Sequence, residues 1–148
     1  MTVKISASSL IEKGTVFHCE LETVNRDGTP YKGNRFLIVL NVNPKTDQVL
    51  ILVTITTKIE KQEKFIKSRG EDADTLVKIS PSDYRYLSGE SAVNCNNTYE
   101  RTLSDLTGKI ENGGKIFSEK VPKNILDALV SGVLKSKQVP DSQKKLII

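Results

Sequence analysis

Hydrophobic residues along the chain fall in short runs that predict β-strands. Residues 15–22 alternate between apolar and polar side chains, which is typical of a strand with one buried face. Residues 35–42 and 49–57 are nearly continuous apolar runs rich in β-branched side chains, and residues 43–47 between them have the composition of a turn. We therefore predict a central antiparallel hairpin that is buried on both sides for much of its length.

The rest of the pattern predicts shorter strands and one long helix. Three further short strands are predicted at residues 75–79, 91–94 and 98–103. The residues that follow Ser80 are typical of a helix start and predict one or two helical turns. Residues 122–135 carry a wide apolar stripe at helical spacing, and Gly132 within it is expected to allow a close approach. Many short strands with one terminal helix indicate a mainly β, α+β fold, built as a small bent sheet or barrel.

The length of 148 residues fits one domain. We place this domain at residues 13–136, after an N-terminal extension at 1–12 and before a loosely held C-terminal tail at 137–148. No apolar run approaches the roughly 20 residues that a membrane helix needs. The first residues lack the apolar core of a signal peptide, so we expect a cytoplasmic protein with no membrane partner.

Composition narrows the candidate chemistry. Cys19 and Cys95 lack metal-site spacing, so we expect reduced packing residues and neither metal nor cofactor. His18 and Cys19 are neighbours on a predicted strand and point to opposite faces, which excludes a catalytic pair. The net charge of +4 is compatible with a nucleic-acid partner. Aromatic residues make up only 5%, which argues against binding of single strands mainly by stacking.

A series of basic residues occupies the polar connection after the second apolar run. It comprises Lys58, Lys61, Lys64, Lys67 and Arg69. These side chains are candidates for contacts with phosphate groups. The alternative is a solvated surface, because glutamates are interleaved with them.

Two further candidates stand at the ends of the predicted hairpin strands. Arg35 opens the first strand and can hold a phosphate through two parallel hydrogen bonds, or it can pair with Glu20 or Glu22. Thr56 and Lys58 close the second strand, where a hydroxyl can donate to a phosphate oxygen, although threonine is also an ordinary strand residue. An antiparallel pairing brings Arg35 and Thr56 to the same end of the sheet.

In order and spacing these elements resemble the MazF/PemK/Kid-like toxins, small SH3-like barrels that dimerise and cut RNA. The shared pattern is a glycine at the first strand, an arginine after a glycine loop, a strand ending in Ile-Thr, later short strands and a terminal helix. The matching segments are residues 13–17, 32–39, 53–58, 91–96, 101–103 and 122–135. The resemblance covers residues 13–136.

The resemblance implies a toxin–antitoxin endoribonuclease that cleaves single-stranded RNA without metal and inhibits growth. The ribose 2′-hydroxyl attacks the phosphate, Arg35 stabilises the charge that builds on it, and Thr56 orients it. The RNA-binding residues implied are Thr57, Lys58, Lys61, Lys64, Asn94 and Asn96. A homodimer and an antitoxin whose acidic segment blocks the groove are the partners implied.

The chain departs from the family pattern at Phe36, on either side of Cys95, and in the loop at residues 24–34, which lacks the family's glycine-rich sequence. Phe36 stands where the family has a proline after the catalytic arginine, and Asn94 and Asn96 flank Cys95 where some members have arginine and aspartate. An amide cannot act as general acid or base, so the sequence assigns no group to proton transfer. The alternative function is therefore a weak or inactive barrel of the same fold that binds RNA or a protein partner. An unrelated small β protein is the remaining interpretation.

Overall fold

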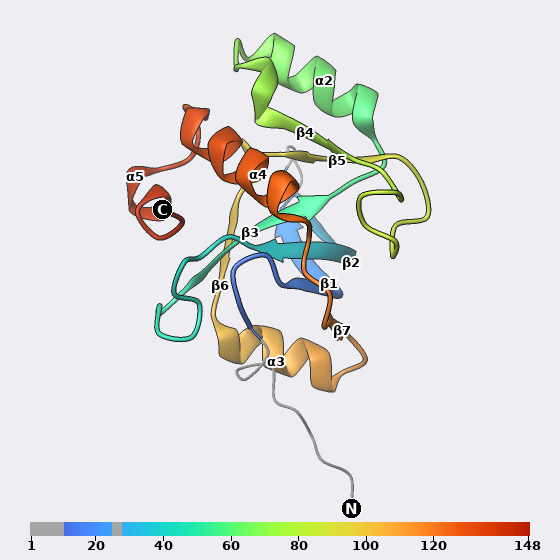
Figure 1. The fold of residues 1–148 in the computed structure, drawn as a ribbon, viewed down its shortest axis with the longest axis vertical. Helices are drawn as coiled ribbons and strands as arrows, with labels where there is room; N and C mark the ends of the chain where they lie inside the picture. Colours follow the sequence, from blue (N-terminus) through green and yellow to red (C-terminus); the bar gives the residue numbers. More distant parts are fainter. Residues whose placement is uncertain (1–10, 25–27) are drawn as a thin grey trace, which may run out of the picture.

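The computed structural model describes residues 11–24 and 28–148, and within them the strands form two antiparallel sheets (Figure 1). The larger sheet has the strand order β6-β3-β2-β1-β7, with β1 at Val16–Val24, β2 at Pro30–Val39, β3 at Leu50–Ile55, β6 at Tyr99–Arg101 and β7 at Lys115–Phe117. The smaller sheet pairs β4 (Leu76–Ile79) with β5 (Ser91–Asn94). The predicted α+β class with mostly antiparallel strands is confirmed.

The predicted central hairpin is confirmed as the pair β2–β3. The two strands are antiparallel, with Phe36 opposite Ile55 and Val39 opposite Leu52. Ile38 belongs to a hydrophobic cluster on one face of the sheet, and Leu37 belongs to a second cluster on the other face. Burial on both faces explains why these strands are nearly continuous apolar runs.

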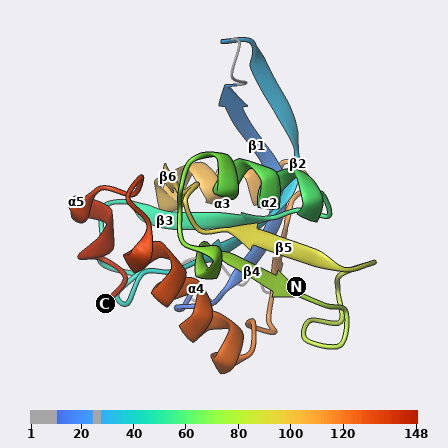
Figure 2. The ribbon, with the colours of Figure 1, turned by 90° about the horizontal axis from the view of Figure 1, so that it is seen from above.

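Helix α3 packs on one face of the large sheet and α4 lies on the side of the other face, while α2 packs against the small sheet (Figures 1 and 2). Their bounds are α2 at Ile59–Ser68, α3 at Leu103–Glu111, α4 at Lys123–Lys135 and α5 at Asp141–Lys144. The predicted long helix is α4, and its glycine makes the expected close approach, since a Cβ at Gly132 would lie 2.7 Å from Sγ of Cys95. In the part of the chain described, no helix combines the length and apolar character needed to cross a membrane.

The strands β1 and β2 form a long ribbon that extends away from the body on the side opposite α4 (Figure 2). Their register runs from Val16 opposite Ile38 to Val24 opposite Pro30. The strand β2 therefore begins five residues before the predicted start at Arg35. Pairing with β1 supplies the hydrogen bonds for this polar segment, whose composition alone predicts no strand.

Three local predictions differ from the structure. The segment 98–103 is a strand only as far as Arg101, because the Thr102 hydroxyl accepts from the Asp105 amide at 3.1 Å and begins α3. The polar connection after β3 contains α2, which the sequence analysis did not predict. Ser80 N donates to Oδ2 of Asp83 at 3.0 Å, yet only a turn forms there.

The predicted N-terminal extension, residues 1–12, lies mostly outside the described residues. Of its last two residues, which are described, Ile11 is fully buried in the cluster beneath α3. Nζ of Lys13 donates to the carbonyl of Ile147 at 2.7 Å, so the start of the described chain contacts its end.

The C-terminal tail, residues 137–148, packs against the body and is not the loosely held segment that we expected. Val139 and Ile147 are buried in the same cluster as α4. The amide of Val42 donates to the carbonyl of Leu146 at 3.0 Å. Apolar side chains at both ends of this segment therefore anchor it to the body. The expectation of a loose tail was wrong because it rested on the average polarity of the segment.

Candidate functional site

Arg35 and Thr56 lie on neighbouring strands at one end of the large sheet. The β2–β3 register ends with Phe36 opposite Ile55, and one further step places Arg35 opposite Thr56. Opposed residues of adjacent strands point to the same face. The backbone of Thr56 is fixed by two hydrogen bonds to Ala92 of β5, at 2.9 and 2.8 Å. The predicted juxtaposition of the two side chains is therefore present.

A cavity of about 150 Å³ opens at this end of the sheet. Five of the predicted site residues line it: Arg35, Thr56, Lys58, Lys61 and Asn94. They come from β2, the end of β3, the start of α2 and the end of β5. The lining holds three cationic side chains and no Asp, Glu or His among the described residues. Such a lining suits an anionic ligand.

The other predicted RNA-binding residues, Thr57, Lys64 and Asn96, do not line the cavity in the described structure. A spacing of three residues on a helix turns each successive side chain by about 60° away from the previous one. Lys58 and Lys61 at the start of α2 therefore face the cavity, and Lys64 is turned away from it. Lys58 and Lys61 therefore remain candidates for phosphate contacts, whereas Lys64 fits the alternative of a solvated surface.

Asn94 connects the elements around the cavity. Its Nδ2 donates to Oε1 of Gln62 on α2 at 3.1 Å. Its Oδ1 accepts from both the backbone N and Nδ2 of Asn96, each at 3.0 Å. Asn96 is buried and also donates to Oγ1 of Thr75 at 2.8 Å. Asn96 therefore fixes the orientation of the Asn94 amide.

The N-terminus of α2 adds to the positive potential of the cavity. The helix begins at Ile59, directly after Lys58, and no side chain caps its first amides. The amide of Ile59 donates to the carbonyl of Thr57 at 3.0 Å, and the helix dipole favours an anion at this end. Oγ1 of Thr56 accepts from the Lys58 amide at 3.2 Å, which leaves the hydroxyl hydrogen for a ligand oxygen.

Arg35 contacts a tyrosine rather than a carboxylate. Its Nη2 donates to Oη of Tyr31 at 3.2 Å, and its guanidinium carbon lies 5.3 Å from the ring centre. Glu20 and Glu22, the alternative partners considered from the sequence, form ion pairs with lysines instead. Among the described residues no carboxylate is paired with Arg35. Its remaining N–H groups are therefore available to an anion.

Among the cavity residues that the sequence analysis did not name as site residues are Tyr31, Gln62 and Tyr99. Tyr31 alternates with Arg35 along β2, so an earlier start of this strand would have indicated it. Gln62 lies one helical turn after Lys58, a relation that becomes visible only once α2 is recognised. Burial raises the pKa of Tyr99, while the charges of Arg35 and Arg101 act in the opposite direction.

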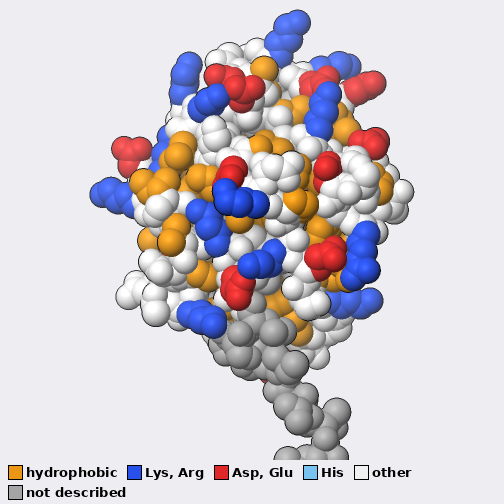
Figure 3. Space-filling model, viewed as in Figure 1, with side chains coloured by type: hydrophobic (Ala, Val, Ile, Leu, Met, Phe, Trp, Pro, Cys, Tyr) orange, Lys and Arg blue, Asp and Glu red, His pale blue; other side chains and the backbone are white. Residues whose placement is uncertain are grey.

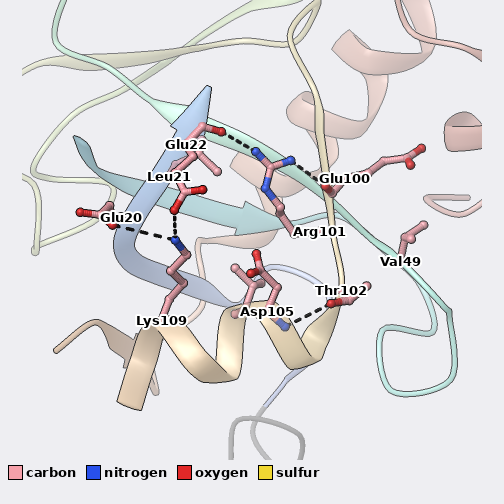
Figure 4. Close-up of a pocket in the computed structure, with 10 residues that line it drawn as sticks. Glu20, Leu21, Glu22, Val49, Glu100, Arg101, Thr102, Asp105 and Lys109 are labelled. Carbon is pink, nitrogen blue, oxygen red and sulfur yellow. Dashed lines mark hydrogen bonds and ion pairs between the residues drawn. The ribbon is translucent and has the colours of Figure 1, made fainter. Parts of the chain in front are cut away.

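A wider hollow of about 590 Å³ adjoins the cavity and extends to Arg101 and Glu22. Beyond it lies a third hollow of about 490 Å³ beside α3 (Figure 4). There Lys109 points toward Glu20 and Glu22, and Arg101 donates to the carbonyls of Glu22 and Glu100. We call the cavity and these two hollows together the groove. The side chains that line it are mainly cationic near α2 and include several carboxylates near α3.

The face of the molecule that carries α4 has a different charge distribution. Lysine, arginine and carboxylate side chains are interspersed on it, without a large patch of one sign (Figure 3). Ion pairs such as Lys123 with Asp127 and Lys135 with Asp74 account for part of this pattern. Charges of one sign are thus gathered in the cavity and not on this face.

The cysteines and the histidine lie outside the cavity. Cys19 and Cys95 are free and buried, as predicted, and burial raises the pKa of both thiols, that of Cys95 to about 12. The ring of His18 packs on Phe36 at 4.5 Å, and its pKa is lowered by burial and by the charge of Lys115. The described residues contain no cluster of three His, Cys, Asp or Glu able to hold a metal ion.

Comparison with solved structures identifies the fold. A chain of MazE–MazF (form III) from Deinococcus radiodurans matches with a TM-score of 0.52 at 12% identity, over 84% of this chain and 92% of that chain. A chain of form II of the same complex matches with a TM-score of 0.52 at 10% identity and the same coverage. No family model and no curated protein matches the sequence. The MazF-like fold predicted from the order of the elements is therefore confirmed.

Proposed function

We propose that this protein is the toxin of a toxin–antitoxin pair, a MazF-like endoribonuclease that cleaves single-stranded RNA. The observation that carries the proposal is that Arg35 and Thr56 line one cavity whose described lining has no carboxylate. The MazF-like fold supports it. Such a cavity can hold a phosphodiester and oppose the charge that develops on it during cleavage.

The proposed reaction uses a nucleophile that belongs to the RNA. The ribose 2′-hydroxyl attacks the neighbouring phosphorus, the P–O5′ bond breaks, and the products are a 2′,3′-cyclic phosphate and a free 5′-hydroxyl. Arg35 holds the non-bridging oxygens through two N–H groups, and the Thr56 hydroxyl donates to one of them. Because such donors act on charge that grows toward the transition state, losing one typically costs about 100- to 1000-fold in rate.

The partners of the proposed toxin follow from the same groove. A cationic cavity that accepts phosphates also accepts a carboxylate-rich peptide, so we propose that an antitoxin blocks it with an acidic segment. The MazE–MazF assembly of the structural neighbours supports a partner of this kind. We further propose that the toxin acts as a homodimer in the cytoplasm.

A cleavage assay with a matched arginine variant tests the function. Wild type, Arg35→Ala and Arg85→Ala are incubated with a single-stranded RNA, with and without EDTA. Arg85 is the control because its Nη2 makes the same contact with a tyrosine, Tyr86, at 2.9 Å outside the cavity. We expect wild type and Arg85→Ala to release cyclic-phosphate ends in EDTA, and Arg35→Ala to be at least 100-fold slower. Equal rates for wild type and Arg35→Ala would end the catalytic assignment.

A second function, RNA binding without cleavage, is favoured by one observation. The described cavity lining has amides such as Asn94 but no imidazole or carboxylate for proton transfer. In that case wild type binds RNA, the affinity falls with added salt, and the RNA stays intact. Induced expression separates the two further, because a nuclease toxin arrests growth and its Arg35→Ala form does not.

A further inference from the structure

The cavity requires a proton donor that the sequence did not assign. When the P–O5′ bond breaks, the departing oxygen must gain a proton, and the described lining has no Asp, Glu or His to supply it. Two tyrosines, Tyr31 and Tyr99, also line the cavity. They are the remaining side chains with acidic O–H groups at this position.

Tyr31 is held against Arg35 by the local structure of β2. Residues 31, 33 and 35 point to one face of the strand, and Oη of Tyr31 accepts from Nη2 of Arg35 at 3.2 Å. Gly33 lies between them, and a Cβ at this position would lie 2.7 Å from Oη of Tyr31. The missing side chain at Gly33 therefore leaves room for the tyrosine ring to lie along the strand and reach the guanidinium.

This arrangement aims the tyrosine hydrogen at a ligand of Arg35. Because Oη accepts from the guanidinium, its own hydrogen is free to be donated elsewhere. A phosphodiester held by the other N–H groups of Arg35 is the neighbouring acceptor. Among the hydrogen bonds of the described residues, Arg35 donates to Tyr31 and not to Tyr99.

We propose that Tyr31 donates the proton to the 5′-oxygen that leaves during cleavage; this rests on the proposed nuclease function. The 2′-oxygen forms the new bond to phosphorus and gives its proton to water. The P–O5′ bond breaks, its electron pair stays on the 5′-oxygen, and the proton of Tyr31 moves to that oxygen. The phenolate then regains a proton from water, so the enzyme returns to its starting state.

The test changes the leaving group as well as the residue. Wild type, Tyr31→Phe and the control Tyr86→Phe are given two RNA substrates, one with the ordinary 5′-oxygen and one with sulfur in its place at the scissile linkage. Tyr86 also accepts from an arginine but lies outside the cavity. We expect Tyr31→Phe to cut the oxygen substrate about 100-fold more slowly, because general acids typically contribute 100-fold or more. A thiolate leaves without a proton, so the sulfur substrate should be cut at the wild-type rate.

A glycine variant tests the positioning independently. Gly33→Ala should displace the tyrosine hydroxyl from Arg35 and give the same dependence on the leaving group, with an unchanged melting temperature, since the displaced atom is the end of a flexible side chain.

The outcomes separate this proposal from the proposed function. If Tyr31→Phe slows both substrates equally, or neither, then Tyr31 is not the proton donor even though the protein is a nuclease. Wild type cutting only the sulfur substrate would also overturn it. If wild type cuts neither substrate, the nuclease function itself fails.

Discussion

Lys61 and Lys64 provide a matched test of the cationic cavity, because they lie on one helix and only Lys61 lines the cavity. The change is Lys61→Gln, compared with Lys64→Gln. Each variant removes one positive charge from a chain whose net charge is +4, so their effects on the long-range potential are similar. A difference between them therefore reports a contact with phosphate and not the overall charge.

The expected magnitude follows from counterion release. For single strands the slope of log K against log salt concentration is about −0.7 for each phosphate neutralised. Four cations line the cavity and the adjoining hollow, namely Arg35, Lys58, Lys61 and Arg101. Wild type should therefore approach a slope of about −2.8 if each of them meets one phosphate. Lys61→Gln should reduce the slope by about 0.7 and weaken binding about fivefold at 0.1 M salt.

Fluorescence anisotropy with a labelled 2′-O-methyl RNA measures this slope, since that strand binds but lacks the attacking hydroxyl. Titrations at salt concentrations between about 0.05 and 0.3 M give the slope of log K against log salt concentration. Lys64→Gln should leave the slope at the wild-type value. Equal changes for Lys61→Gln and Lys64→Gln, or a larger change for Lys64→Gln, would refute the assignment of the cavity as the phosphate site.

Three further predictions concern the body that supports the cavity. Gly132→Ala should lower the free energy of unfolding, measured with urea, because overpacking costs about 1–3 kcal/mol and exceeds the gain in helix propensity. Gly108→Ala, in a helix with open space around it, should instead stabilise by up to about 1 kcal/mol, and the opposite pair of signs would contradict the packing. Ile147→Ala should destabilise by about 2–5 kcal/mol if the tail is part of the core, whereas a loosely held tail gives no change. The thiols of Cys19 and Cys95 should resist Ellman's reagent at about pH 8 until unfolding, since burial raises both pKa values and lowers the thiolate fraction; rapid reaction of the native protein would contradict this.

The central hairpin was predictable because its signal is local. The apolar runs of β2 and β3 are fully buried, and the turn between them has a distinct composition. This pairing alone places Arg35 and Thr56 at one end of the sheet. Their precise opposition depends on the register, which starts at Phe36 and Ile55 and which the sequence pattern does not determine to one residue.

The elements that the sequence did not reveal depend on distant partners. The first part of β2 is polar and becomes a strand through its pairing with β1. The helix α2 has only three apolar residues, Ile59, Phe65 and Ile66, and of these only Ile66 is buried. The start of α3 depends on one hydroxyl, that of Thr102. The first part of β2 carries Tyr31 and α2 carries Gln62, so missed elements explain these two missed site residues, whereas Tyr99 lies in β6, within a predicted strand.

The position of α2 determines which residues of the basic series can act on a ligand. The hydrogen bond from Asn94 to Gln62 ties the first turns of the helix to the end of β5, and Thr56 is tied to the same strand through Ala92. The start of α2 is thereby held over the end of β3, which is where Arg35 lies. A lysine early in the helix faces the cavity for this reason, while its later lysines turn toward β4 or solvent.

If RNA binds as proposed, the change of sign along the groove limits the path of the strand. Phosphates are favoured between α2 and Arg101, but the hollow beside α3 exposes them to several carboxylates. In that hollow Lys109 is already paired with Glu20 and Glu22, so its charge is largely compensated. A strand whose phosphate lies between Arg35 and Thr56 should therefore leave the cavity past Arg101 along the β1–β2 ribbon, and not along α3. This path places the strand beside Tyr31, the residue on that ribbon to which proton donation is assigned.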